Sequence, residues 1–220
     1  MEEVFDRGIA FVFEGTTEKV FYLSILEHMC QRHAGYHLEK AVADLPGETN
    51  YLICKNDISI LVKTYTVGTI TQIVNSRNWV INACCHRYRN LSWCVFLCYD
   101  TDDYLAPVTK FYEGDWVELR HRLKEANVKT VIDMAASADI EDLMLCDFQG
   151  VLAHLKIPAC SLPSGKKGKT KMKKLFKIAS RTYHEGDRAK PLIDVLDKDV
   201  VIFHALVPFN ELEKYCFPFE

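Results

Sequence analysis

The chain has 220 residues, of which 49% are hydrophobic and 26% charged, and its formal net charge at pH 7 is −3. This length and composition predict a soluble protein with a full hydrophobic core. No apolar stretch reaches the roughly 18 to 20 residues that span a bilayer, and the acidic start Met1-Glu2-Glu3 lacks the features of a secretory signal, so we expect a cytoplasmic protein without a membrane partner.

The first element in chain order is an apolar run at about residues 8–14, which ends in Glu14 and is followed by Gly15 and Glu18. The run predicts a strand buried on both faces, and residues 17–33 predict a helix with a broad apolar face. A polar connection containing Pro46-Gly47 leads to a second predicted strand near residues 58–65. A helix is then expected from residue 68 towards 87. The histidines at 28, 33 and 37 are interpreted as surface or helix-end residues rather than ligands.

A second acidic cluster follows the apolar run 93–99, at Asp100, Asp102 and Asp103. If the strand continues, Asp100 and Asp102 point the same way about 6–7 Å apart, because strand residues rise about 3.3 Å each and alternate faces. Carboxylates placed so need a counter-cation, and oxygen ligands without soft donors favour Mg²⁺ or Mn²⁺. The alternative is a solvated turn with an Asx-type cap.

A third acidic cluster follows a predicted helix at 115–126 and a predicted strand at 128–134. It runs from Ser137 through Asp139, Glu141 and Asp142 to Asp147, and either Ser137 or Asp139 can serve as a helix N-cap. Acids in a first helical turn are ordinarily explained by free N–H groups and the helix dipole. Capping therefore stands beside metal binding as an interpretation of this cluster.

The order of these motifs resembles the TOPRIM domain, and within it the nuclease branch that includes OLD-family and RloB-like proteins. The resemblance covers roughly residues 7–155. It implies a small, mainly parallel, Rossmann-like sheet sandwiched by helices, and a metal-dependent endonuclease that hydrolyses phosphodiester bonds of DNA or RNA, in a setting such as bacterial or phage defence. Members often carry a histidine shortly after the third acidic position, where this chain has Asp147, with His154 further along.

The resemblance also assigns roles to residues. It implies catalytic roles for Glu14, Asp100, Asp102 and Glu141, with Glu14 as a general acid/base or a ligand. The residues implied as ligands of Mg²⁺ or Mn²⁺, with either one or two metal ions, are Asp100, Asp102, Asp103, Glu14, Glu18 and Glu141. Association with a partner ATPase or another defence protein is a further expectation.

A basic segment follows the acidic part of the chain. Residues 163–177 hold seven lysines and no acid, which suits a phosphate-backbone ligand. The residues expected to bind nucleic acid are Lys166, Lys167, Lys169, Lys171, Lys173 and Lys174. The alternatives are a solvated loop with a basic helix face, and a nucleotide-binding P-loop ending in Gly168-Lys169-Thr170, which lacks a convincing preceding strand.

The expected organisation is an α/β catalytic core at residues 1–155 and an α/β extension at 156–220 packed on the same domain. Nine cysteines without a Cys-x-x-Cys pattern indicate a reducing compartment, not a metal cluster. Alternatives to the nuclease are a non-catalytic effector that binds nucleic acid or protein, a primase-like enzyme and a phosphatase. A haloacid dehalogenase-type enzyme fits less well, because its Asp-x-Asp motif ends the first strand.

Overall fold

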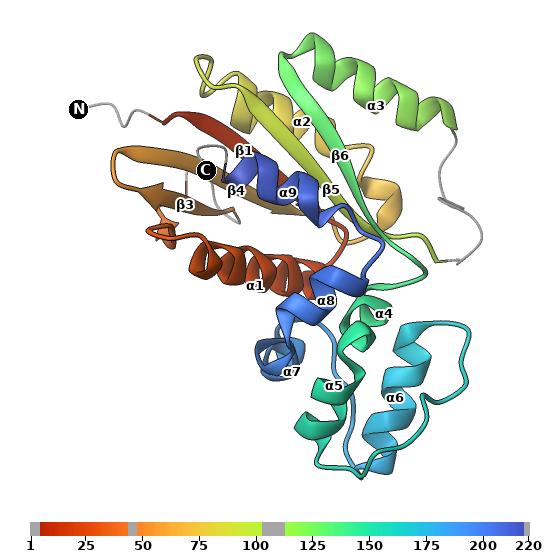
Figure 1. Cartoon of the computed structure of the whole chain (residues 1–220). Helices are drawn as coiled ribbons and strands as arrows, with labels where there is room; N and C mark the ends of the chain where they lie inside the picture. Colours follow the sequence, from red (N-terminus) through yellow and green to blue (C-terminus); the bar gives the residue numbers. More distant parts are fainter. Residues whose placement is uncertain (1–4, 44–47, 103–112, 218–220) are drawn as a thin grey trace.

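The computed structural model describes residues 5–43, 48–102 and 113–217, which form one six-stranded sheet flanked by helices (Figure 1). The strands are β1 (Arg7–Phe13), β2 (His37–Ala41), β3 (Thr49–Lys55), β4 (Ile58–Thr66), β5 (Trp93–Asp100) and β6 (Val128–Ala136). Their order is β2-β3-β4-β1-β5-β6. The last four are parallel to one another, whereas β2 and β3 run antiparallel to their neighbours. The prediction of a mainly parallel, Rossmann-like α/β fold is confirmed.

Helices cover both faces of the sheet. In the described residues they are α1 (Thr16–Arg32), α2 (Ser76–Trp79), α3 (Glu113–Glu125), α4 (Ile140–Met144), α5 (Phe148–Leu155), α6 (Gly168–Ile178), α7 (Lys190–Val195), α8 (Lys198–His204) and α9 (Phe209–Cys216), with 3-10 turns η1 (Ile70–Gln72), η3 (Leu145–Asp147) and η4 (Gly186–Ala189) and a π-helical segment η2 (Val80–Cys85). One face packs against α1 and the helices after β6, and the other packs against η1, η2 and α3.

Strand β5 shows why the sequence of a central strand in this sheet is an uninterrupted apolar run. Phe96 and Cys98 belong to the core on the α1 face, while Val95 and Leu97 belong to the core on the α3 face. A strand whose alternate side chains are buried on opposite faces has no polar positions until it leaves the sheet. The first acid of the cluster therefore marks the strand end, and Asp100 is the last residue of β5.

The β2–β3 hairpin was not predicted, because residues 34–57 had been interpreted as a polar connection. Strand β2 has only five residues, none of them fully buried, and three are exposed. A short edge strand with one solvated side lacks the apolar run that identifies a buried strand. Pro46 and Gly47 lie outside the described residues.

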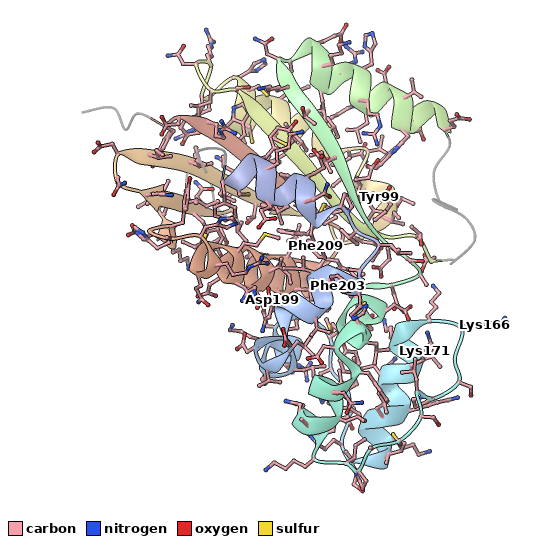
Figure 2. All side chains as sticks on the ribbon, viewed as in Figure 1. Tyr99, Lys166, Lys171, Asp199, Phe203 and Phe209 are labelled. Atoms are coloured by element: carbon pink, nitrogen blue, oxygen red, sulfur yellow. The ribbon has the colours of Figure 1, made fainter. Side chains whose placement is uncertain are left out.

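The predicted strand content of the C-terminal extension is wrong: residues 156–217, all described, contain helices and no strand. The apolar stretch 200–203 belongs to α8. Asp197 caps this helix by accepting hydrogen bonds from the amides of Asp199 and Val200 at 3.0 and 3.2 Å. Val201 is buried in the core and Phe203 is 82% exposed (Figure 2), so the stretch follows the one-sided burial of a helix. Within the described residues, no helix is both long and apolar enough to cross a membrane.

Candidate functional site

The two predicted acidic strand ends meet at one edge of the sheet. Strands β1 and β5 are parallel neighbours, and Phe13 pairs with Cys98. The Glu14 amide donates to the Cys98 carbonyl at 2.9 Å, and the Asp100 amide donates to Glu14 Oε2 at 3.0 Å. The carboxyl ends of parallel strands are where α/β proteins place their ligands. Glu14 and Asp100 therefore lie at the edge that topology favours for a functional site.

Asp100 is in the least favourable environment for a charged carboxylate. Burial, and then the charges of Glu18, Glu14, Asp139 and Glu141, raise the pKa of Asp100 to about 9. Its Oδ1 atom is buried, and no hydrogen-bond partner for it is found among the described residues. A buried acceptor without a partner costs folding free energy, so this oxygen marks a place where a ligand would be stabilising.

Glu18 joins this group from the first turn of α1. Its side chain is buried, with the residue only 6% exposed, and burial raises its pKa to about 7, with Glu14 and Glu185 adding repulsion. Gly15 leaves the room for it, because a Cβ atom at position 15 would lie 2.8 Å from Glu18 Oε2. The glycine between β1 and α1 thus allows the acid to fold back over the strand ends.

Glu141 approaches the edge from α4. It is buried, accepts a hydrogen bond from the Tyr183 hydroxyl at 2.9 Å, and has a pKa raised to about 7 by burial and by the charge of Asp139. Tyr183 was missed by the sequence analysis. It lies 42 residues further along the chain, in the segment between α6 and η4, where no local pattern indicates contact with an acid.

Asp102 does not continue the alternation expected from Asp100. Strand β5 ends at Asp100, and Asp102 has a φ of +62° with its amide donating to the Ala138 carbonyl at 2.8 Å. Its carboxylate forms an ion pair with Lys167. The expected placement of the two aspartates on the same strand face is therefore wrong, because the chain turns before the second one, whereas metal binding by Asp102 stays a prediction. Asp103 lies outside the described residues.

The acids at the start of α4 are engaged mainly in capping. Asp139 is the N-cap of α4, accepting from the Asp142 amide at 3.1 Å, and its other oxygen accepts from the Lys169 amide at 3.0 Å. Asp142 accepts from the Gly168 amide at 2.8 Å. The starts of α4 and α6 thus pack together, and a Cβ atom at Gly168 would lie 2.2 Å from the Asp142 nitrogen. The capping interpretation applies to these two residues.

This packing also argues against the P-loop alternative. Residues 157–167 are all described and form no strand, so the strand that precedes a phosphate-binding loop is missing. The first amides of α6, which would bind phosphate in a P-loop, donate instead to the two aspartates.

The six lysines expected to bind nucleic acid differ in their surroundings. Three of them pair with acids: Lys167 with Asp102, Lys169 with Glu185 at 2.6 Å, and Lys171 with Asp142 at 2.9 Å. Lys174 donates to the Ser164 carbonyl at 2.7 Å. Lys166 and Lys173 are exposed, and Lys166 lies on the loop before α6, at the rim of the molecule (Figure 2). Nucleic acid binding by this segment stays a prediction.

The strand-end acids suit a hard divalent cation better than a soft one, because they offer carboxylate oxygens only. No three of them in the described part of the chain bring their oxygens within 4.8 Å of one another. Mg²⁺ commonly uses one or two protein carboxylates and fills its remaining positions with water and substrate phosphate. The residues present therefore fit a cation of the Mg²⁺ or Mn²⁺ type held by Asp100 and one neighbouring glutamate.

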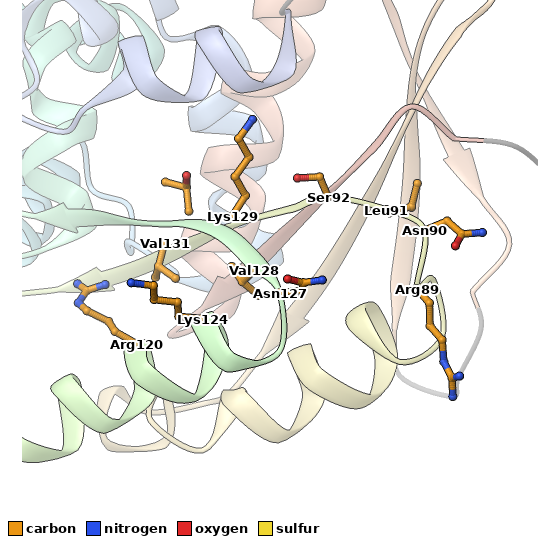
Figure 3. A pocket seen from close by; sticks show the side chains of 11 residues that line it. Arg89, Asn90, Leu91, Ser92, Arg120, Lys124, Asn127, Val128, Lys129 and Val131 are labelled. Carbon is orange, nitrogen blue, oxygen red and sulfur yellow. The ribbon is translucent and has the colours of Figure 1, made fainter.

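A cavity of about 760 Å³ lies at the opposite end of the sheet (Figure 3). Its walls include Ser92 and Val128, where β5 and β6 begin, and the basic residues Arg89, Lys124 and Lys129. Because these strands are parallel, their starts are separated from Asp100 by the full length of β5. This cavity is not part of the acidic edge.

Comparisons with known proteins return no family model and no curated protein. Solved structures that match include a futalosine hydrolase mutant of Helicobacter pylori (10% identity, 90% of this chain and 97% of that chain, TM-score 0.27). Two further matches are Helicobacter pylori MTAN (14%, 86% and 100%, TM-score 0.26) and the Campylobacter jejuni 5′-methylthioadenosine/S-adenosyl homocysteine nucleosidase (14%, 96% and 98%, TM-score 0.30). At these TM-scores the matches identify no function for this chain.

The TOPRIM resemblance is corrected as a family assignment: no family model matches the chain, and the solved structures named above are a futalosine hydrolase and two nucleosidases rather than TOPRIM nucleases. The nuclease activity and the role in antiviral defence that it implied are wrong with it. The physical reason is that short acidic motifs after buried parallel strands arise in any doubly wound sheet with a site at its carboxyl edge. The expectation of a divalent cation therefore depends only on the geometry of the acidic residues.

Proposed function

We propose that the chain is a hydrolase whose acidic edge binds one divalent cation and acts on a small phosphorylated substrate. The observation that carries this proposal is the Asp100 carboxyl, which is held among four other acids with one buried oxygen unpartnered by the described residues. Ionising Asp100 in this arrangement opposes folding unless a cation compensates the charge, and carboxyl groups with strongly raised pKa values cluster at functional sites.

The surroundings of each acidic residue indicate its role in the proposed reaction. Asp100 and either Glu14 or Glu18 would hold the cation, since these two glutamates act most strongly on Asp100. Glu141, fixed by the Tyr183 hydroxyl and with a pKa near 7, is suited to move a proton at neutral pH. When bound, a divalent cation supplies charge neutralisation and polarisation of a phosphoryl group.

The nearby lysine side chains favour phosphate as the group on which the protein acts. The basic helix α6 begins beside the start of α4, and Lys167 already contacts Asp102 at the rim of the acidic edge. A substrate phosphate would replace Asp102 as the partner of Lys167. The same phosphate would complete the coordination of the cation. The substrate we propose is a phosphate monoester or anhydride of nucleotide size.

The test is phosphate release from p-nitrophenyl phosphate and from nucleoside mono-, di- and triphosphates, with Mn²⁺, Mg²⁺ or EDTA. We expect hydrolysis with either metal and none with EDTA. Asp100→Asn keeps the shape but lowers the rate by about 10²-fold or more, which is about 2.7 kcal/mol in the barrier. Asp133→Asn is the matched control, because Asp133 is a partly buried acid that pairs with Arg120 away from this edge.

Equal rates for Asp100→Asn and wild type would contradict the proposal, as would phosphate release that EDTA leaves unchanged. A nucleoside panel in EDTA is included as a separate arm. Release of free base there would indicate glycosidic hydrolysis by the carboxyl groups without a metal. Mn²⁺ binding by the wild type that Asp100→Asn abolishes, without turnover of any substrate, would instead favour a non-catalytic binding protein.

A further inference from the structure

A second group of metal-binding side chains lies on the β2–β3 hairpin. His37 and Glu39 belong to β2 and Cys54 to β3. One ligand atom from each lies within 4.8 Å of the other two, and His37 Nε2 is 2.8 Å from Glu39 Oε1. In the described residues this is the one group of three such side chains that meets this distance. It is separate from the acidic edge, because Cys54 lies beside the start of β4, at the other end of the sheet.

The backbone itself brings these three residues together. His37 pairs directly with Cys54 in the antiparallel register, and Glu39 follows two residues along the same strand. Directly paired residues point to the same face of a sheet, as do residues at i and i+2. The nitrogen, oxygen and sulfur ligands therefore share one face without any unusual backbone conformation.

We propose that His37, Glu39 and Cys54 bind one Zn²⁺ ion. An imidazole, a carboxylate and a thiolate match the ligands of zinc, whereas the thiolate disfavours Mg²⁺ and Ca²⁺. Neighbouring ligands in a tetrahedral zinc site lie about 3.3–3.8 Å apart, so only small side-chain movements are needed. The His37 and Glu39 side chains are 55% and 56% exposed and are able to make them. The fourth position is left to water.

Two features of the surroundings support the site. Ser59 lies opposite Cys54 on β4 and its side chain hydrogen-bonds the thiol, which orients the sulfur. Burial, and then the charge of Glu39, raise the pKa of this thiol, so a bound cation is what would hold it as the thiolate. Zn²⁺ bound to one thiolate, one carboxylate and a neutral imidazole is also a neutral unit, which costs little on a half-exposed surface. Such an ion would tie the edge strand β2 to β3. The sequence interprets His37 as a surface or helix-end residue rather than a ligand. His37 is exposed, but it begins β2 and does not belong to the end of α1, which is at Arg32.

The test uses Co²⁺ as a probe in the reduced full-length chain, because cobalt bound to a thiolate gives a near-ultraviolet charge-transfer band that cobalt on carboxylates lacks. We expect one equivalent of Co²⁺ to produce the band and Zn²⁺ to remove it by competition. Cys54→Ser abolishes the band, and Cys160→Ser, which alters an exposed cysteine elsewhere, retains it. Asp100→Asn also retains it, which separates this site from the proposed hydrolase site.

His37→Ala and Glu39→Ala are expected to lower Co²⁺ affinity at least about 10-fold each, since even outer partners of metal ligands are worth 10- to 100-fold. Both side chains are exposed, so these variants carry the test if Cys54→Ser fails to fold. A wild-type protein without the band in excess Co²⁺, a band that persists in Cys54→Ser, or unchanged affinity in both alanine variants would overturn the proposal.

Discussion

The acids at the strand ends and the acids at the start of α4 are neighbours with opposite uses. Asp139 and Asp142 accept hydrogen bonds from backbone amides of α4 and α6, so their side chains cap two helix starts. Asp100 and Glu18 are buried with raised pKa values, and their charges repel one another. Burial raises the pKa of Asp139 as well, to about 6, and Glu18 also accepts hydrogen bonds from the backbone amides of Gly15 and Glu18. The two sets therefore differ in how far amide hydrogen bonds offset the cost of burial, and the contrast is strongest between Asp139 and Asp100.

The sharpest way to break this contrast is Asp139→Ala. The substitution removes the acceptor for the amides of Asp142 and Lys169, and each lost cap costs about 1 kcal/mol, partly offset by reduced repulsion on Asp100. We expect a net loss of about 1.5 kcal/mol in the free energy of unfolding, measured by urea denaturation.

Asp139→Asn is the matched control for this prediction, because asparagine is as good an N-cap as aspartate. It should recover at least half of the lost stability. If Asp139→Ala proved as stable as the wild type, Asp139 would belong with the repelling acids rather than with the capping ones.

The central elements of the fold could be predicted from the sequence, because buried parallel strands have a strong local sequence pattern. The four parallel strands, α1 and α3 lie within a few residues of their predicted positions. The β2–β3 hairpin left no such signal, since its outer strand is short and mostly exposed. The helical nature of 200–203 depends on the Asp197 cap and on packing of α8 against η3, and an apolar run of four residues does not distinguish a helix from a strand.

The site was predictable in part for the same reason. Glu14 and Asp100 converge because they end adjacent parallel strands, and strand pairing follows from the topology. The engagement of Asp102 by Lys167 and of Glu141 by Tyr183 could not be predicted, because those contacts join segments 65 and 42 residues apart. Which acids bind amides, and which are left to bind a ligand, is decided by such long-range packing.

The pH dependence of stability tests the repelling group directly. Glu18 has a folded-state pKa of about 7, against 4.5 for an ordinary glutamate, so the folded protein binds more protons than the unfolded chain between these values. Stability must then fall as pH rises through this window, since the unfolded state is the one that ionises easily. We expect Glu18→Gln to match the wild type near pH 4 and to exceed it by about 1 to 2 kcal/mol at pH 8 without metal.

Thermal or urea unfolding at pH 4, 6 and 8 in EDTA measures this difference. Glu213→Gln, which alters a partly exposed glutamate paired with His33, provides a glutamate control outside the acidic edge. If the stability difference between Glu18→Gln and wild type did not grow with pH, the pKa of Glu18 would not be raised in the folded protein.

The smallest effect is expected for Lys169→Met. This variant tests whether the positive charge of the basic segment stabilises the ionised acids at the start of α4. The Lys169 and Glu185 side chains are 41% and 45% exposed, so their ion pair is worth about 0 to 1 kcal/mol and is screened by salt. The Lys169 backbone amide, which donates a hydrogen bond to Asp139 Oδ2, is unaffected by the substitution. We expect a change below about 0.5 kcal/mol in urea denaturation at 0.15 M salt. A loss above about 1 kcal/mol that shrinks with added salt would mean that the ammonium group offsets the charges of Asp139 and Glu141, and the two sets of acids would then be one electrostatic unit.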